Sequence, residues 1–200
     1  ELDVLPVNLF ERLRRLFPGA DFIDISATIK EIRMIKSAYE INFFRRANEI
    51  SLHVYEQIPA YLQAGKPEVI LSAELENLYR RQGHQALLRM RAFNMEMFFC
   101  HVYSGENGAA GSFLDSCTGG RGVSAAWPQS SGWRTLGCHE PISIDYSSIC
   151  EGYILDHARV FSIGELPSDL EKAYGLAVSI QDEVVAHAHP GASCRDLYQV

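Results

Sequence analysis

Two aspartates, Asp145 and Asp156, stand eleven residues apart in the segment ISIDYSSICEGYILDHARVF, residues 142–161. Most of the residues around them are apolar, as in two buried strands, and Gly152 lies where a tight turn would join them into a hairpin. Two carboxylates in such a hairpin repel each other unless one is protonated or a cation lies between them. Because hard divalent ions prefer oxygen ligands, the segment is a candidate metal site.

The turn decides whether the two carboxylates share a face of the hairpin. A two-residue loop at Cys150-Glu151 places Asp145 directly opposite Asp156. A loop at Glu151-Gly152 instead places Asp156 opposite Ser147, with Asp145 as its diagonal neighbour on the same face. Facing Cβ atoms are roughly 5 Å apart and diagonal neighbours roughly 7–8 Å, so either register allows a shared ligand. A three-residue loop without a bulge would separate the carboxylates onto opposite faces.

The spacing also leaves a local explanation open, in which each aspartate caps a backbone group or pairs with a neighbour such as Arg159. His157 adjoins Asp156, so in a strand it points to the opposite face and is interpreted as structural.

The elements that must position this hairpin are mostly helical. Apolar periodicity predicts helices over about 7–17, 37–63, 67–83 and 168–189, a helix starting after Ser193, a short strand at 21–26 and a strand-like stretch over 87–103. Ser168 and Ser193 are the expected N-caps of the last two helices. Residues 104–137 are irregular and rich in glycine, and a loop region of this length is typical of functional segments.

The composition favours a globular chain and excludes some partners. The chain has 200 residues, 47% hydrophobic and 22% charged, with a net charge of −7, which argues against a nucleic-acid partner. No apolar run approaches the roughly 18 residues of a membrane span. The acidic start ELDVLP is unlike a secretory leader, and the five cysteines form no CxxC pair. These features predict reduced thiols and a cytoplasmic location.

Three segments carry a resemblance to a known superfamily. IDYSSICEGYILDHARVFSIG resembles the vDxG…GYxxDxtRtfxiG signature of the pita-bread metallopeptidases, which include methionine aminopeptidase, aminopeptidase P, prolidase and the metal-free creatinase. IRMIKSAYEINFFRRANEIS and AHAHPGASCRDLY are similar to two helical segments of the proline-specific branch. The likeness covers about residues 28–200. Residues 1–27 look like the tail and linker of a separate N-terminal creatinase-like domain.

This resemblance implies an α/β (α+β) pita-bread fold, an antiparallel sheet covered by helices, of which residues 28–200 form the N-terminal part of the catalytic domain. It implies a dinuclear aminopeptidase or dipeptidase of Xaa-Pro type, in which a metal-bridging water attacks a short peptide substrate. Two divalent ions (Mn, Co or Zn) are the implied cofactors, with Asp145 binding one and Asp156 bridging both. The remaining ligands, one histidine and two glutamates, are expected beyond Val200, so residues 1–200 alone should be inactive. A homodimer is expected.

The sequence departs from the family pattern at the substrate site. Proline-specific members carry a histidine about 17 residues before the first aspartate, but this region reads Trp127-Pro128-Gln129 here. His139 lies much closer to Asp145, and His101 lies well before it. Gln129 is therefore the candidate substrate-binding residue, in place of the lost hydrogen-bond donor.

Two other functions remain as alternatives. The lost histidine favours a non-catalytic pita-bread module that binds peptides or proteins. A metal-free amidinohydrolase like creatinase is the second alternative, but such a site has no need of two retained aspartates.

Overall fold

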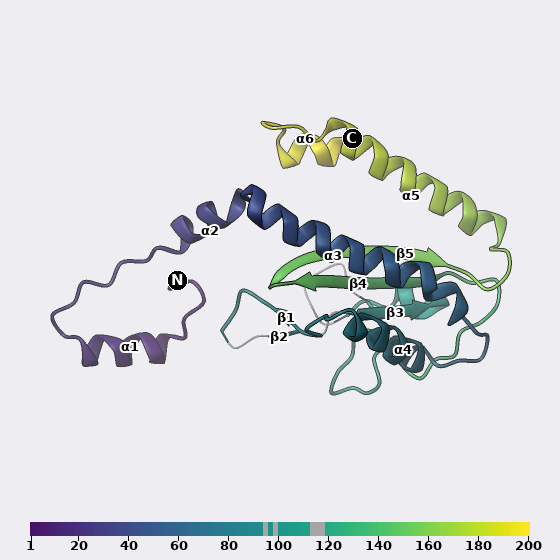
Figure 1. The fold of residues 1–200 in the computed structure, drawn as a ribbon, viewed down its shortest axis with the longest axis horizontal. Coiled ribbons are helices and arrows are strands. Elements are labelled where there is room, and N and C mark those ends of the chain that lie inside the picture. The colour runs from purple at the N-terminus through teal and green to yellow at the C-terminus, as the bar shows by residue number, and fades with distance from the viewer. Residues whose placement is uncertain (94–95, 98–99, 113–118) are drawn as a thin grey trace.

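The computed structural model describes residues 1–93, 96–97, 100–112 and 119–200, and shows the predicted mixture of helices and antiparallel strands (Figure 1). The elements in chain order are α1 (Val7–Leu16), α2 (Ser26–Met34), α3 (Ala38–Gln57), η1 (Ile58–Ala60), α4 (Glu68–Arg81), β1 (Leu88–Arg89), β2 (Glu96–Met97), β3 (Cys100–Ser104), η2 (Gly105–Ala109), β4 (Ile142–Cys150), β5 (Tyr153–Phe161), α5 (Ser168–His187) and α6 (Cys194–Gln199).

The central sheet has three antiparallel strands in the order β3-β4-β5. Strands β4 and β5 form the predicted hairpin, and its two-residue loop is Glu151-Gly152, with φ of 51° and 83°. Two successive positive φ values give the loop a twist that matches the strands it joins, and glycine adopts one of them without strain. Of the two registers considered, the structure has the one in which Ser147 faces Asp156.

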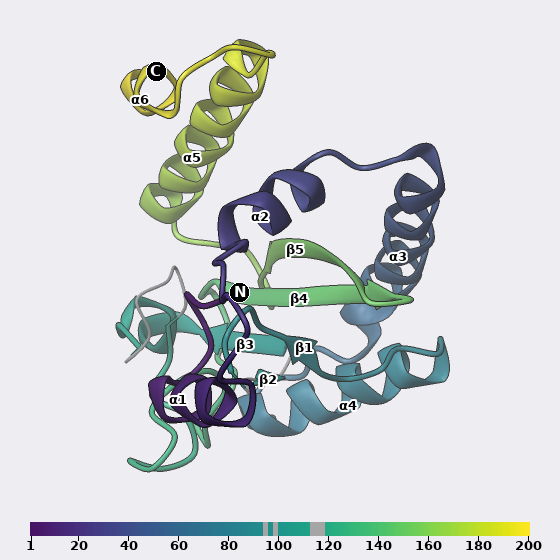
Figure 2. The same ribbon diagram turned by 90° about the vertical axis from the view of Figure 1, so that its left-hand side faces the viewer.

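Helices α3 and α4 cover one face of this sheet (Figures 1 and 2). The core lies between them, and its side chains are almost completely buried: Val54, Ile58, Leu71, Leu75, Ile142, Ile144 and Tyr146. Tyr146 of β4 stacks on Tyr79 of α4 with ring centroids 4.8 Å apart, and its hydroxyl donates to the Ser72 carbonyl oxygen at 2.9 Å. This contact buries two aromatic rings and satisfies the polar end of one of them, so it fixes α4 on the sheet.

Two local predictions are wrong. The strand expected at 21–26 is absent, because the Asp24 carboxylate accepts from the backbone of Ser26 and of Leu2, and α2 begins directly afterwards. An aspartate that bonds two residues onward favours a turn over a strand. Ser168 is not an N-cap: Pro167 occupies that position and no side chain caps the helix. Ser193 is the cap of α6, as predicted, and accepts from the Asp196 amide at 3.1 Å.

Helix α3 starts at a capping box that the sequence analysis missed. Ser37 accepts from the Glu40 amide, and the Glu40 carboxylate accepts from the Ser37 amide at 2.7 Å. The regular helix then ends at Gln57, earlier than the predicted 63. Pro59 follows there in η1 and lacks the amide hydrogen that an α-helix would need.

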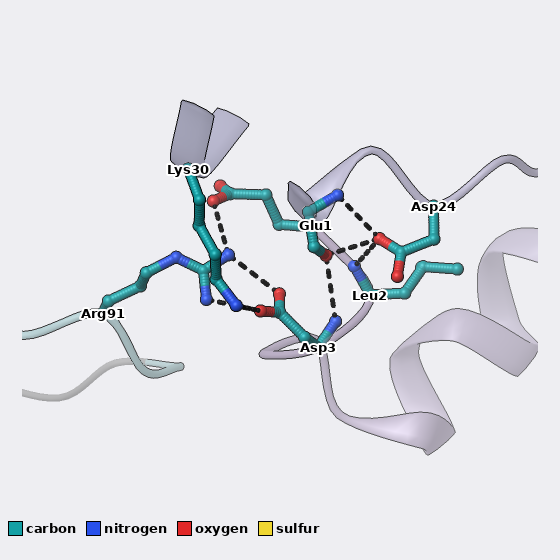
Figure 3. Close-up of polar contacts among 7 residues, drawn as sticks. Glu1, Leu2, Asp3, Asp24, Lys30 and Arg91 are labelled. Atoms are coloured by element: carbon teal, nitrogen blue, oxygen red, sulfur yellow. Dashed lines mark hydrogen bonds and ion pairs between the residues drawn. The ribbon is translucent and has the colours of Figure 1, made fainter. Parts of the chain in front are cut away.

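A polar cluster fastens the N-terminal segment to the rest of the chain (Figure 3). The Asp3 carboxylate accepts two hydrogen bonds from the Arg91 guanidinium, at 2.6 and 2.9 Å, and pairs with Lys30 of α2 at 2.9 Å. These two cations hold the pKa of Asp3 well below its usual range. The domain boundary predicted after residue 27 falls inside α2, and the division itself remains a prediction.

Helices α5 and α6 extend away from the sheet, and neither contains a buried residue (Figures 1 and 2). In the part of the chain that the structure describes, no helix combines the length and apolar character needed to cross a membrane.

Candidate metal and substrate site

Asp145 and Asp156 lie on the same face of the β4–β5 hairpin, opposite to the face that α3 and α4 cover. Asp145 pairs with Ala158, and Asp156 pairs with Ser147, so the two carboxylates are diagonal neighbours. They are close enough to share a hydrogen bond. Asp156 is exposed to solvent and Asp145 is half-buried. The hairpin therefore presents two carboxyl groups side by side at the surface of the sheet.

The electrostatics of the pair match a cation site. Burial raises the pKa of Asp145 to about 7, and the neighbouring Asp156 carboxylate adds to this effect. A carboxyl group that retains its proton near neutral pH because of a like charge will release it to a metal ion. The pair supplies two donors only, and the described residues contain no group of three or more His, Cys, Asp or Glu side chains able to hold a metal. The residues present fit part of a metal site.

The local explanation for the aspartates is met only in part: the facing Ser147 hydroxyl donates to Asp156 Oδ1 at 3.5 Å. Among the described residues Arg159 forms no ion pair with either aspartate; its guanidinium lies 5.9 Å from the Tyr55 ring centroid. His157 contacts Ser51 of α3, with 3.0 Å between Nδ1 and Oγ, so it points to the helical side as predicted.

Two aromatic side chains of β3 share the face of the carboxylates. His101 pairs directly with Asp145, and Tyr103 follows two residues later. Their rings stack with centroids 5.5 Å apart, and both are buried. Burial lowers the pKa of His101 to about 4, although Asp156 opposes this, so the ring is neutral at neutral pH. The sequence pattern does not assign His101 to the site, because only the β3–β4 register brings it beside Asp145.

The outer edge of β3 is closed by side chains instead of another strand. The Ser130 hydroxyl donates to the Cys100 carbonyl oxygen at 3.2 Å, and the Val102 amide donates to Ser131 Oγ at 3.1 Å. These two contacts place residues 130–131 along β3, on the side away from β4. The two contacts are made at Cys100 and Val102, the neighbours of His101 in β3, and His101 itself pairs with Asp145 of β4.

One buried carboxylate ties this region to α4. Glu68 is completely buried, and its Oε1 accepts from both the amide and the hydroxyl of Ser104, each at 2.7 Å. Its Oε2 accepts from Asn107 Nδ2 at 2.7 Å and from the Gly132 amide at 3.0 Å. Four donors stabilise a charge that would otherwise be costly to bury. Glu68 thus holds the end of β3, η2 and the segment after Gln129 in one arrangement.

Gln129 is the predicted substrate-binding residue, and its environment is unusual. It has no exposed surface, yet neither its Nε2 nor its Oε1 has a hydrogen-bond partner among the described residues. The next residue, Ser130, has a φ of 66°, a backbone conformation that residues other than glycine rarely adopt. An unsatisfied buried amide beside a strained backbone costs stability and calls for an explanation.

Comparisons with known proteins bear on the family and the fold. The profile of metallopeptidase family M24 matches residues 42–200. A prolidase structure from Pyrococcus horikoshii OT3 matches with a TM-score of 0.77 and 21% identity, over 96% of this chain and 48% of that one. An X-Pro aminopeptidase from Thermotoga maritima MSB8 matches with a TM-score of 0.73 and 24% identity, over 90% and 44% of the two chains. These likenesses confirm the pita-bread fold.

A curated relative from Bacillus subtilis, the putative dipeptidase YkvY, is 22% identical over 197 residues, which are 98% of this chain and 47% of the relative. The uncharacterized peptidase YqhT of the same organism is 23% identical over 177 residues, 88% of this chain and 43% of the relative. The chain therefore spans somewhat less than half the length of these proteins.

Proposed function

Because the chain belongs to metallopeptidase family M24, we propose that it contributes to a dinuclear metal-dependent aminopeptidase or dipeptidase that hydrolyses short peptides near their N-terminus. The observation that carries this proposal is the pair Asp145 and Asp156, two adjacent carboxyl groups on the open face of the hairpin. Similarity to an X-Pro aminopeptidase and a prolidase supports Xaa-Pro peptides as the first substrates to consider.

In this proposal Asp145 and Asp156 would both serve as ligands for the divalent ions (Mn²⁺, Co²⁺ or Zn²⁺). Such ions acidify water and polarise a peptide carbonyl, which is the chemistry that hydrolysis needs. The other donors come from outside residues 1–200, so this part alone is inactive. Two findings support that: the described residues contain no group of three or more His, Cys, Asp or Glu side chains able to hold a metal, and the chain spans less than half of its relatives.

The β3 side of the site receives the peptide. His101 and Tyr103 form its aromatic floor beside Asp145, and Ser130 and Ser131, which directly follow Gln129, lie along the outer edge of the same strand. Because His101 is neutral, it can contact the peptide without adding a charge next to the two carboxylates. A cytoplasmic location agrees with the four described cysteines, all of which are free thiols, whereas Cys117 lies outside the described residues. The expected homodimer is tested by sedimentation.

Metal content tests the proposal directly. The full-length protein is loaded with Mn²⁺, Co²⁺ or Zn²⁺, dialysed and analysed for bound metal, beside Asp156→Asn and the control Asp182→Asn on the exposed face of α5. We expect Asp156→Asn to lose metal and Asp182→Asn to retain it. Stoichiometric metal in Asp156→Asn would show that Asp156 is not a bridging ligand.

Hydrolysis of Xaa-Pro and Xaa-Ala peptides separates the enzyme from its alternatives. Turnover that depends on added metal supports the peptidase. Peptide binding without turnover, with any of the three metals, would favour the non-catalytic binding module. The creatinase-like alternative requires activity that survives chelation.

A further inference from the structure

Gln129 is held in place at the expense of stability. Its amide loses its contacts with water and gains no partner among the described residues, a loss that an apolar side chain of similar size would avoid. Ser130 holds its strained φ only because the hydrogen bonds around it fix both ends of the segment: its amide donates to the Gly119 carbonyl at 2.8 Å, and its carbonyl accepts from the Gly122 amide at 3.2 Å. A costly group in an over-determined segment is typical of a site that waits for a ligand.

The segment lies within reach of a ligand at the two carboxylates. It runs along β3, and β3 separates it from β4, which carries Asp145. Neighbouring strands are about 4.8 Å apart, so Asp145 is about two strand spacings away, roughly 10 Å. An extended chain covers that distance in about three residues. A short peptide with its scissile bond over the carboxylates therefore reaches the segment at Ser130, next to Gln129, with a residue on one side of that bond.

The chemistry of a carboxamide selects what it can recognise. Gln129 offers one donor group and one acceptor, and neither has a partner in the part of the chain that the structure describes. In an extended peptide the N–H and the C=O of one residue point to the same side, as they do in a hydrogen-bonded strand pair. A carboxamide can therefore accept from that N–H and donate to that C=O at once. Proline, which has no N–H, cannot satisfy both atoms.

We propose that Gln129 is a specificity residue that pairs with the backbone N–H and C=O of one non-proline residue of the peptide substrate. The proposal rests on the proposed peptidase function and deepens it: an Xaa-Pro dipeptide lacks such a residue after its first position, whereas a longer peptide, or one with another second residue, contains it. Since Gln129 has no exposed surface in the free chain, its side chain must rotate out of its enclosure when the peptide binds.

Backbone methylation tests the pairing. Binding of the tripeptide Leu-Ala-Ala to the full-length, metal-free protein is measured by calorimetry, together with two forms that carry an N-methyl group on the second or on the third residue. We expect one methylation to weaken binding about tenfold or more, which identifies the residue that Gln129 contacts. In Gln129→Leu the parent peptide should bind as weakly as the methylated one, and the same methylation should have no further effect.

A matched control separates recognition from stability. Ser148 also has a buried hydroxyl without a partner among the described residues, but it lies on the helical side of β4. Gln129→Leu and Ser148→Ala should both raise Tm by a few degrees, because each removes an unsatisfied polar group. Only Gln129→Leu should change peptide affinity.

Three outcomes would overturn the proposal. They are no binding of the parent tripeptide, an equal loss of affinity on methylation in the wild-type protein and in Gln129→Leu, or an unchanged affinity of Gln129→Leu for the parent tripeptide. Any of these can coexist with metal-dependent hydrolysis, so failure of this inference is distinct from failure of the peptidase proposal, which would show as an absence of metal-dependent turnover.

Discussion

Replacing Asp156 by asparagine in the metal-free protein should release the proton that Asp145 holds. The pKa of Asp145 is about 7 because the carboxyl group is buried, and because Asp156 lies beside it. Asparagine removes the second cause and leaves the first. We therefore expect the pKa of Asp145 to fall in Asp156→Asn and yet to stay above its ordinary value of 3.8.

The same titration makes stability depend on pH. A displacement from 3.8 to about 7 corresponds to about 4 kcal/mol between the two protonation states. Partial exposure of Asp145 to solvent reduces this to about 2 kcal/mol. Because the folded form holds the proton more tightly than the unfolded form, this contribution is fully present below pH 3.8 and lost as the pH rises through 7. The metal-free protein should thus lose about 2 kcal/mol of stability between pH 4 and 8 that Asp145→Asn does not lose.

Carbon-13 NMR of the Asp145 carboxyl carbon follows its titration, and urea unfolding at several pH values follows stability. Asp182→Asn, which removes a charge from α5, should leave both curves unchanged. A wild-type pKa of Asp145 near 3.8, or an equal pKa in wild type and Asp156→Asn, would refute the reasoning about the pair.

Four further substitutions test the framework of the fold, each by urea denaturation. Glu68→Ala leaves four buried donors without an acceptor and should cost about 3–5 kcal/mol; a loss below about 1 kcal/mol would contradict the role of Glu68. Gly122→Ala drives a Cβ into the Trp127 carbonyl oxygen at a φ of 64° and should destabilise by about 2 kcal/mol or more. Gly175→Ala in α5, where the Cβ meets nothing within 4 Å, should stabilise by about 0.5–1 kcal/mol; equal effects of the two glycine changes would disprove the close approach. Ser37→Ala breaks the capping box of α3 and should cost about 1 kcal/mol, and no change in unfolding midpoint would show that the cap is dispensable.

Local patterns in the sequence predicted the hairpin well. A two-residue loop with Gly152 and apolar strands on both sides limits the register to a few choices, and two of those place Asp145 and Asp156 on one face. The errors were also local in origin. The strand predicted at 21–26 has an alternating pattern, but hydrogen bonds of the Asp24 side chain compete with strand pairing there.

The remainder of the site depends on contacts between distant parts of the chain. His101 comes to lie beside Asp145 because β3 pairs with β4, across about forty residues of intervening chain. Nothing in the periodicity of either strand specifies that pairing. The same holds for Glu68, which reads in the sequence as an ordinary helix start and is instead a fully buried acceptor of four hydrogen bonds.

The long sequence separations of the Glu68 contacts also have a kinetic meaning. Its partners Ser104, Asn107 and Gly132 are 36, 39 and 64 residues away, so the loops that they close must form before the carboxylate gains its donors. Contacts of this kind are commonly absent from the folding transition state and present in the native state. Weakening them accelerates unfolding and leaves the rate of folding almost unchanged. We therefore expect the lifetime of the folded chain to depend strongly on one glutamate on the far side of the sheet from the two aspartates.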